Sequence, residues 1–265
     1  MAIKLVALDL DDTLLDHSNK ISPRTREIIR QAVGQGVTVT VATGRMYSSA
    51  LPFAQQLALD VPLITYNGAL IKSALSGETL MHTPIEEETA LQVLTLFKDK
   101  GWYIQSYLND TLYVAELDVK ARYYEKLAGV QAVAIGDALY TMKGTPTKLL
   151  ALSEPGEIKL INETVNAVMG DKLYTAVSKP NYLEMANPAV NKGKALAFLA
   201  ASLGIKQHEV MAVGDSVNDL DMLEYAGLGV AMGNASDKVK AAANEVTCGN
   251  DADGVAEAII KYVLR

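Results

Sequence analysis

Short apolar runs, each followed by polar residues, recur through the first part of the chain. The first of them, residues 3–8, shows no alternation of apolar and polar positions, which is typical of a strand buried on both faces of a sheet. Residues 37–41 and 61–65 are two further runs of this kind, and helices are predicted between them at 24–35 and 46–59. Strands that alternate with helices in this way predict a parallel sheet covered by helices on both faces.

The pattern changes in the middle of the chain, where paired strands and helices predict an α+β domain inserted into the first one. The elements expected in this insert are helices at 86–101, 118–128 and 156–169 and strands at 102–108, 111–115, 148–152, 173–177 and 182–185. After the insert the first pattern returns, with helices expected at 193–203, 218–225, 237–244 and 254–264 and strands at 210–213, 228–231 and 246–247. We therefore expect a discontinuous core domain, 1–83 and 190–265, interrupted by a second domain, 84–189.

The composition excludes several classes of protein. A net charge of −7 and a pI near 5.1 argue against a broad nucleic-acid or anionic-membrane surface, because both need clustered positive charge. No run is long and apolar enough for a membrane span, and the first residues lack the pattern of a signal peptide. The single cysteine, Cys248, excludes an internal disulfide, so we expect a cytoplasmic protein. The sequence leaves its oligomeric state open.

Two acidic clusters follow predicted parallel strands. Asp9, Asp11 and Asp12 come directly after the first strand, and Asp215 and Asp219 come after the strand at 210–213. Each cluster alone has a structural reading, as a helix N-cap with an acidic turn in the first case and as an Asx turn with an N-cap in the second. Because the carboxyl ends of parallel strands lie at one edge of a sheet, we expect the two clusters to meet there.

The chemistry of these residues predicts a magnesium site. Carboxylate oxygens suit Mg²⁺, and too few histidines or cysteines lie nearby to favour zinc. The expected metal ligands are Asp9, Asp11 and Asp215.

Together with two further segments, the acidic clusters resemble the four motifs of the haloacid dehalogenase (HAD) superfamily, and most closely those of its Cof-type sugar phosphatases. The matching segments are residues 9–13 (DLDDT), 43–45 (TGR), 190–193 (VNKG) and 214–219 (GDSVND). The resemblance extends over the whole chain, and the insert has the length and place of the family's C2-type cap. It implies a Rossmann-like, doubly wound parallel sheet with an inserted α+β cap domain. Asp12 departs from the family, which usually has glycine there, so we expect Asp12 in a left-handed or turn conformation.

The resemblance also implies roles for the acidic residues, with which electrostatics agrees. A phosphate dianion about 4 Å from a carboxylate is repelled by about 8 kcal/mol at an effective dielectric constant of about 20. A carboxylate nucleophile therefore needs compensation, expected from Lys192 and from Mg²⁺ held by Asp9, Asp215 and the backbone carbonyl of Asp11. Asp9 is then the nucleophile that forms an aspartyl-phosphate, and Asp11 is the general acid and base.

The remaining motif residues are expected to bind or support the phosphoryl group. The expected phosphate-binding residues are Leu10, Thr43, Gly44, Lys192 and Asn218, with Asp219 orienting Lys192 or a metal-bound water. Some have simpler alternatives: Thr43 as the N-cap of the next helix, and Lys192 as a solvated charge at a helix start. Arg45 is expected at the surface or facing the cap.

These expectations define a Mg²⁺-dependent phosphomonoester hydrolase acting on a small phosphorylated metabolite, with a sugar phosphate as the expected substrate. One alternative is a phosphomutase or phosphotransferase of the same superfamily. Another is a non-catalytic phosphate-sensing module, because receiver domains also combine carboxylates, a threonine and a lysine. Asp11 favours the enzyme, since an acid two residues after the nucleophile helps to release an alcohol. The size of the insert also exceeds what a compact receiver needs.

Overall fold

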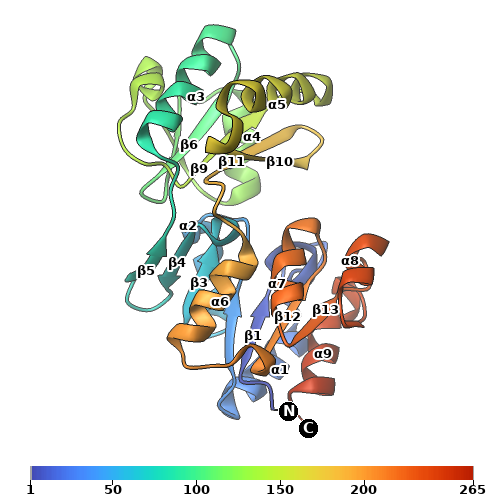
Figure 1. Cartoon of the computed structure of the whole chain (residues 1–265). Helices are drawn as coiled ribbons and strands as arrows, with labels where there is room; N and C mark the ends of the chain where they lie inside the picture. Colours follow the sequence, from blue (N-terminus) through green and yellow to red (C-terminus); the bar gives the residue numbers. More distant parts are fainter. Residues whose placement is uncertain (1, 265) are drawn as a thin grey trace. The chain divides into compact units, whose positions relative to one another are not determined.

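In the computed structural model, which describes residues 2–264, the chain forms two compact units (Figure 1). The first unit contains the chain up to Met81 and the chain from Asn191 onward, and the second contains His82–Val190.

A five-stranded parallel sheet forms the centre of the first unit, in the order β14-β13-β12-β1-β2. Its strands are β1 (Leu5–Leu8), β2 (Thr38–Val41), β12 (Val210–Gly214), β13 (Leu228–Ala231) and β14 (Glu245–Val246). In β1, Leu5 pairs with Val210 of β12 on one side and with Thr38 of β2 on the other. All four residues of β1 are buried, which confirms the strand covered on both faces that its apolar run predicts.

Helices cover both faces of this sheet, so the predicted doubly wound architecture is confirmed. On one face lie α6 (Lys192–Ser202), α7 (Leu220–Tyr225) and α8 (Asp237–Ala242), whose apolar residues pack with those of β1 and β12. On the other face lie α1 (Pro23–Gly34) and α9 (Gly254–Tyr262), which contact one another (Figure 1). The start of α1 follows the usual rule for helix N-termini, because Ser22 accepts a hydrogen bond from the Thr25 N–H and a proline comes next.

After β2 the chain forms the helix and the strand predicted from the sequence, followed by two strands that the apolar pattern does not reveal. Helix α2 (Tyr47–Gln56) leads to β3 (Pro62–Thr65), and a parallel bridge between Ala42 and Ile64 joins β3 to the end of β2. A short 3₁₀ turn, Tyr66–Gly68, follows β3. The chain then forms β4 (Leu70–Ser73) and β5 (Thr79–His82), which with β3 make a three-stranded sheet.

The second unit is a six-stranded mixed sheet in the order β10-β11-β9-β6-β7-β8. Its strands are β6 (Ile104–Leu108), β7 (Thr111–Val114), β8 (Ala132–Ala134), β9 (Lys148–Leu152), β10 (Tyr174–Lys179) and β11 (Tyr182–Ala186). Its helices are α3 (Glu87–Lys100), α4 (Val119–Ala128) and α5 (Pro155–Met169), and apolar residues of α3 and α5 pack with β6, β9 and β11. The predicted hairpin of β6 and β7 is confirmed: both of its turn residues, Asn109 and Asp110, have positive φ, as a tight two-residue loop requires.

Within residues 2–264, no helix combines the length and the hydrophobicity that crossing a lipid bilayer requires.

Candidate active site

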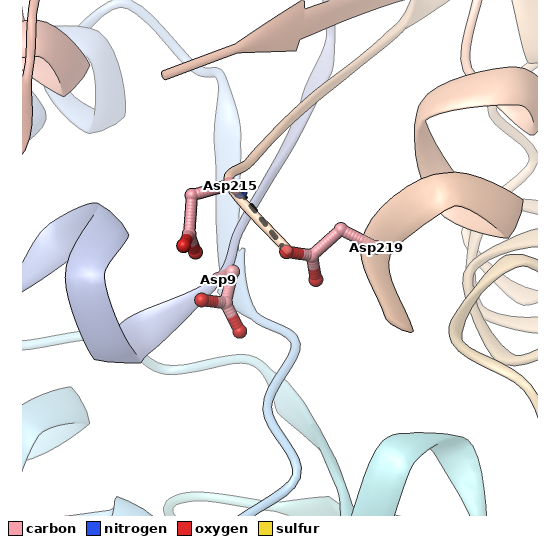
Figure 2. Close-up of side chains that lie close together, drawn as sticks. All are labelled: Asp9, Asp215 and Asp219. Atoms are coloured by element: carbon pink, nitrogen blue, oxygen red, sulfur yellow. Dashed lines mark hydrogen bonds between the residues drawn. The ribbon is translucent and has the colours of Figure 1, made fainter. Parts of the chain in front are cut away.

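Three carboxylates from two segments of the chain converge at the carboxyl edge of the parallel sheet. Asp9 follows β1 and Asp215 follows the neighbouring strand β12, and the Asp9 N–H donates a hydrogen bond to the Val213 carbonyl at 3.0 Å. Asp9, Asp215 and Asp219 each have a carboxylate oxygen that lies within 4.8 Å of those of the other two (Figure 2). The predicted meeting of the two acidic clusters is therefore confirmed.

Lys192, the first residue of α6, supplies positive charge to this cluster. Its Nζ lies 2.6 Å from Asp9 Oδ1 and 2.6 Å from Asp219 Oδ1, and its side chain is 0% exposed. Burial lowers the pKa of Lys192, but the two carboxylates raise this pKa by more, so it lies above its ordinary value. The alternative of a solvated charge at a helix start is therefore wrong.

Asp219 is fully buried, and both of its oxygens are used. Oδ1 binds Lys192, and Oδ2 accepts hydrogen bonds from the backbone N–H groups of Asp215 and Ser216 at 3.0 and 2.9 Å. A Cβ on Gly214 would lie 2.6 Å from the Cβ and Cγ of Asp219, so only glycine allows this close approach. Asp219 thus fixes both the lysine and the loop that carries Asp215.

Burial and the neighbouring carboxylate Asp219 raise the pKa of two residues in the cluster. Burial, with a further contribution from Asp219, raises the pKa of Asp215 to about 6. Burial and then Asp219 likewise raise the pKa of Asp9 well above its ordinary value, although Lys192 acts in the opposite direction. A bound cation would offset both effects. Carboxylate oxygens are the donors that Mg²⁺ prefers, so the residues present fit a divalent metal.

Thr13 holds the carboxylate of Asp215 in place and was not assigned a role from the sequence. Its hydroxyl donates a hydrogen bond to Asp215 Oδ1 at 3.0 Å, and the hydroxyl of Ser216 donates to Oδ2 at 2.9 Å. The only sequence signal for Thr13 is its place in the first motif. The signal for Ser216 is that it directly follows Asp215.

Asp11 is not one of the three clustered carboxylates, and it pairs with Arg45. Arg45 donates hydrogen bonds from Nε to Asp11 Oδ2 at 2.9 Å and from Nη2 to Oδ1 at 2.5 Å. The guanidinium also lies over the ring of Phe53, 5.1 Å from its centroid. The side chain of Arg45 is only 18% exposed. Arg45 is therefore largely buried, with its charge paired within the first unit, and the expectation that it faces the cap stays a prediction.

Two of the predicted phosphate-binding residues, Leu10 and Thr43, are buried. The hydroxyl of buried Thr43 accepts a hydrogen bond from the Arg45 N–H at 3.1 Å. Because α2 has Met46 at its N-cap position, the alternative of Thr43 as that cap is wrong. The side chain of Leu10 is fully buried, so only its backbone can serve a ligand.

Asn218 and Gly44 meet at a residue to which sequence analysis gave no role. Asn218 Nδ2 donates a hydrogen bond to Asn67 Oδ1 at 3.0 Å. A Cβ on Gly44 would lie 2.9 Å from the same Asn67 oxygen. The sequence marks Asn67 and the following Gly68 only as a turn.

The predicted left-handed conformation of Asp12 is confirmed, with φ of 58° and ψ of 10°.

Comparison with known proteins agrees with this geometry. Residues 6–259 match the model of the haloacid dehalogenase-like hydrolase family. The chain is 33% identical to the 5-amino-6-(5-phospho-D-ribitylamino)uracil phosphatase YcsE of Bacillus subtilis, covering 99% of this chain and 96% of that protein. It is 30% identical to phosphatase YwpJ of the same organism, covering 99% and 100% of the two chains.

Among solved structures, a haloacid dehalogenase-like hydrolase from Bacteroides thetaiotaomicron superposes with a TM-score of 0.92 at 30% identity, over 98% of this chain and 99% of that one. The sheet order, the carboxylate cluster with its buried lysine and these similarities lead to one assignment. The chain belongs to the haloacid dehalogenase-like hydrolases, within their Cof-like phosphatases.

Proposed function

We propose that this protein is a Mg²⁺-dependent phosphomonoester hydrolase that acts on a sugar phosphate through an aspartyl-phosphate. The observation that carries the proposal is the placement of Asp9, whose buried carboxylate lies beside the Lys192 ammonium and within the carboxylate cluster of Asp215 and Asp219. If Lys192 only formed a structural salt bridge, one carboxylate would be enough to balance its charge. Three carboxylates at one sheet edge instead suit a site that binds a cation together with a phosphate.

Asp9 attacks the phosphorus atom. Lys192 binds Oδ1 of Asp9, so we assign the attack to Oδ2. The new bond joins this oxygen to phosphorus while the bond from phosphorus to the ester oxygen breaks. Asp11 donates a proton to the departing alkoxide, which leaves as an alcohol. Asp11 then removes a proton from the water that attacks the aspartyl-phosphate, and this second step releases inorganic phosphate and restores Asp9.

The other residues of the site offset negative charge. Asp9, Asp215 and the backbone carbonyl of Asp11 would hold Mg²⁺, which would supply positive charge to the phosphoryl group. Asp219 acts on this site indirectly, because it holds Lys192 and the Asp215 loop.

We assign the binding of phosphoryl oxygens to donors in four segments of the first unit. The donors are the N–H groups of Leu10 and Gly44, the hydroxyl of Thr43, the amide of Asn218 and the ammonium of Lys192. All five can donate a hydrogen bond, as an anionic ligand requires.

We assign residues 84–189 to a cap domain that selects the substrate, and residues 1–83 with 190–265 to the catalytic core. One similar protein is named for a phosphate on a ribityl chain, a sugar alcohol. This similarity supports a small substrate that carries its phosphate on a polyhydroxylated carbon chain.

The experiment that tests the proposal measures phosphate release from a panel of phosphomonoesters in Mg²⁺ or in EDTA. The panel contains sugar phosphates, sugar-alcohol phosphates including 5-amino-6-(5-phospho-D-ribitylamino)uracil, and nucleotides. We expect Mg²⁺-dependent release that is fastest with the sugar or sugar-alcohol phosphates and absent in Asp9→Asn.

Three other results would overturn the proposal. A phosphomutase would convert a sugar phosphate into its isomer without releasing phosphate. A sensing module would keep a stable phosphoryl group and turn over no ester. Hydrolysis that persists in Asp9→Asn would exclude the nucleophile.

A further inference from the structure

The turn Tyr66–Gly68 has an uncommon backbone conformation. Its three residues have consecutive positive φ values of 52°, 57° and 101°. This region is open to glycine and tolerated by asparagine, but it is unfavourable for a tyrosine. Non-glycine residues held in this region cost about 1–3 kcal/mol each and cluster at functional sites. The turn therefore has to be held by its surroundings.

Backbone contacts fix this turn against two segments of the site. The Asn67 N–H donates to the Thr43 carbonyl at 2.9 Å, and the Tyr66 N–H donates to the Arg45 carbonyl at 2.9 Å. On the other side, a Cβ on Gly68 would lie 2.5 Å from the carbonyl oxygen of Asn191, the residue before Lys192. The turn thus packs against the segments that carry Thr43 and Lys192.

The side chain of Asn67 reaches a third segment. Its Oδ1 accepts the hydrogen bond from Asn218 Nδ2 at 3.0 Å. Its amide also packs closely on Gly44, where a Cβ would lie 2.9 Å from Oδ1 and 3.2 Å from Nδ2. One half-buried side chain therefore contacts both Gly44 and Asn218, two residues to which we assign phosphate binding.

We infer that Asn67 is a positioning residue that orients the Asn218 amide and the Gly44 backbone for the phosphoryl group, an inference that rests on the proposed function. A carboxamide carries two N–H donors. One N–H of Asn218 binds Asn67, which sets the plane of the amide, and the second N–H serves a phosphoryl oxygen. Asparagine meets both demands of position 67, since it tolerates positive φ and offers an acceptor at the right distance.

The test uses Asn67→Gly, because glycine keeps the positive φ and removes only the side chain. Binding of inorganic phosphate in the presence of Mg²⁺ is measured by calorimetry, and KM and kcat are measured on the best substrate. We expect phosphate to bind about 10- to 150-fold more weakly, the range of one lost hydrogen bond to a charged group. KM should rise by a similar factor while kcat falls less. The same affinity and KM as in the wild type would overturn the inference.

A second variant separates positioning from folding. Asn67→Asp keeps the shape, the tolerance of positive φ and the acceptor for Asn218, but it places a negative charge beside the phosphate. We expect weaker phosphate binding than in the glycine variant, with an unfolding midpoint close to that of the wild type. If Asn67→Gly does not fold, Asn67→Asp still tests whether side chain 67 lies beside the bound phosphate, and phosphate affinity equal to that of the wild type would then overturn the inference.

A double-mutant cycle tests the path through Asn218. If Asn67 acts by orienting that amide, Asn67→Gly should weaken phosphate binding little further in the Asn218→Ala background. Fully additive losses would overturn the inference. Asn109→Gly is the matched control, since Asn109 also has positive φ but lies in the β6–β7 hairpin; we expect wild-type phosphate affinity.

The binding measurement also separates this inference from the proposed function. A wild-type protein that binds phosphate but hydrolyses no ester would refute the proposed function, while the phosphate affinities would still decide the role of Asn67. Hydrolysis by the wild type, with no effect of the Asn67 variants, would refute the inference alone.

Discussion

Arg45 binds both carboxylate oxygens of Asp11, with Nε 2.9 Å from Oδ2 and Nη2 2.5 Å from Oδ1. A guanidinium that pairs with a carboxylate in this two-point manner fixes its orientation as well as its position. The ring of Phe53 packs against the guanidinium and limits its movement. The residue that we propose as general acid is therefore held by a partner from the second motif.

The first prediction is that Arg45→Ala impairs hydrolysis of poor leaving groups most. General acid catalysis contributes about 10²–10⁴ in rate, and p-nitrophenolate leaves without needing a proton. We expect kcat/KM to fall at least about tenfold more for an alkyl phosphate than for p-nitrophenyl phosphate. Arg45→Lys keeps the charge but cannot bind both carboxylate oxygens with a planar guanidinium. Its kcat/KM for the alkyl phosphate should therefore lie between those of the wild type and Arg45→Ala. Equal losses on both substrates would contradict this role of Arg45.

The second prediction concerns the buried lysine. Lys192→Met removes the partner of two buried carboxylates, Asp9 and Asp219, and leaving charges unpaired in this way costs about 3–5 kcal/mol. We expect urea unfolding in EDTA to show a loss of this size. Adding Asp219→Asn should restore part of the stability, because the amide removes one charge and still accepts from the loop N–H groups. The double variant should remain inactive. A single variant as stable as the wild type would contradict the prediction.

Much of the fold follows from the sequence because the central strands are apolar throughout. Residues 5–8 are apolar at every position, as a strand buried on both faces requires, and β1 is buried along its whole length. Two of the strands that sequence analysis missed, β5 and β8, lack this signal. All four residues of β5 are exposed or partly exposed, and β8 has three residues, none of them buried. For such strands, pairing with a neighbour rather than hydrophobicity decides the structure.

The sequence predicts which residues form the site, but it does not predict how their side chains pair with one another. The acidic clusters and Lys192 are visible as motifs, and topology brings them to one edge of the sheet. The pairing of Arg45 with Asp11 depends on the direction of two side chains, which no sequence periodicity encodes. The contacts of Asn67 depend on a turn conformation whose neighbours lie far away in the chain. These are tertiary effects, and a local pattern carries no record of them.

The third prediction is that Mg²⁺ stabilises the protein through the carboxylate cluster. A ligand that binds only the folded state adds about 2.7 kcal/mol at a hundred times its dissociation constant. We expect the thermal midpoint to rise with Mg²⁺ concentration in the wild type and to rise much less in Asp215→Asn. Asp12→Asn is the control, because it removes a nearby charge that is not a member of the cluster. An undiminished rise in Asp215→Asn would exclude Asp215 as a ligand.

The last prediction concerns the backbone of Asp12, the position where the family usually has glycine. Its φ of 58° lies in the left-handed region, and its carbonyl accepts a hydrogen bond from Asn234 Nδ2 at 2.8 Å, which helps to hold that conformation. The left-handed region costs an ordinary L-residue about 1–2 kcal/mol, and a β-branched side chain suffers most. We therefore expect Asp12→Val to lower the free energy of unfolding by at least that amount, whereas Asp12→Gly should leave it nearly unchanged. Urea unfolding in EDTA measures both variants without a contribution from bound metal. Equal stability of the valine and glycine variants would show that the backbone at this position relaxes freely, and the departure from glycine would then carry no conformational cost.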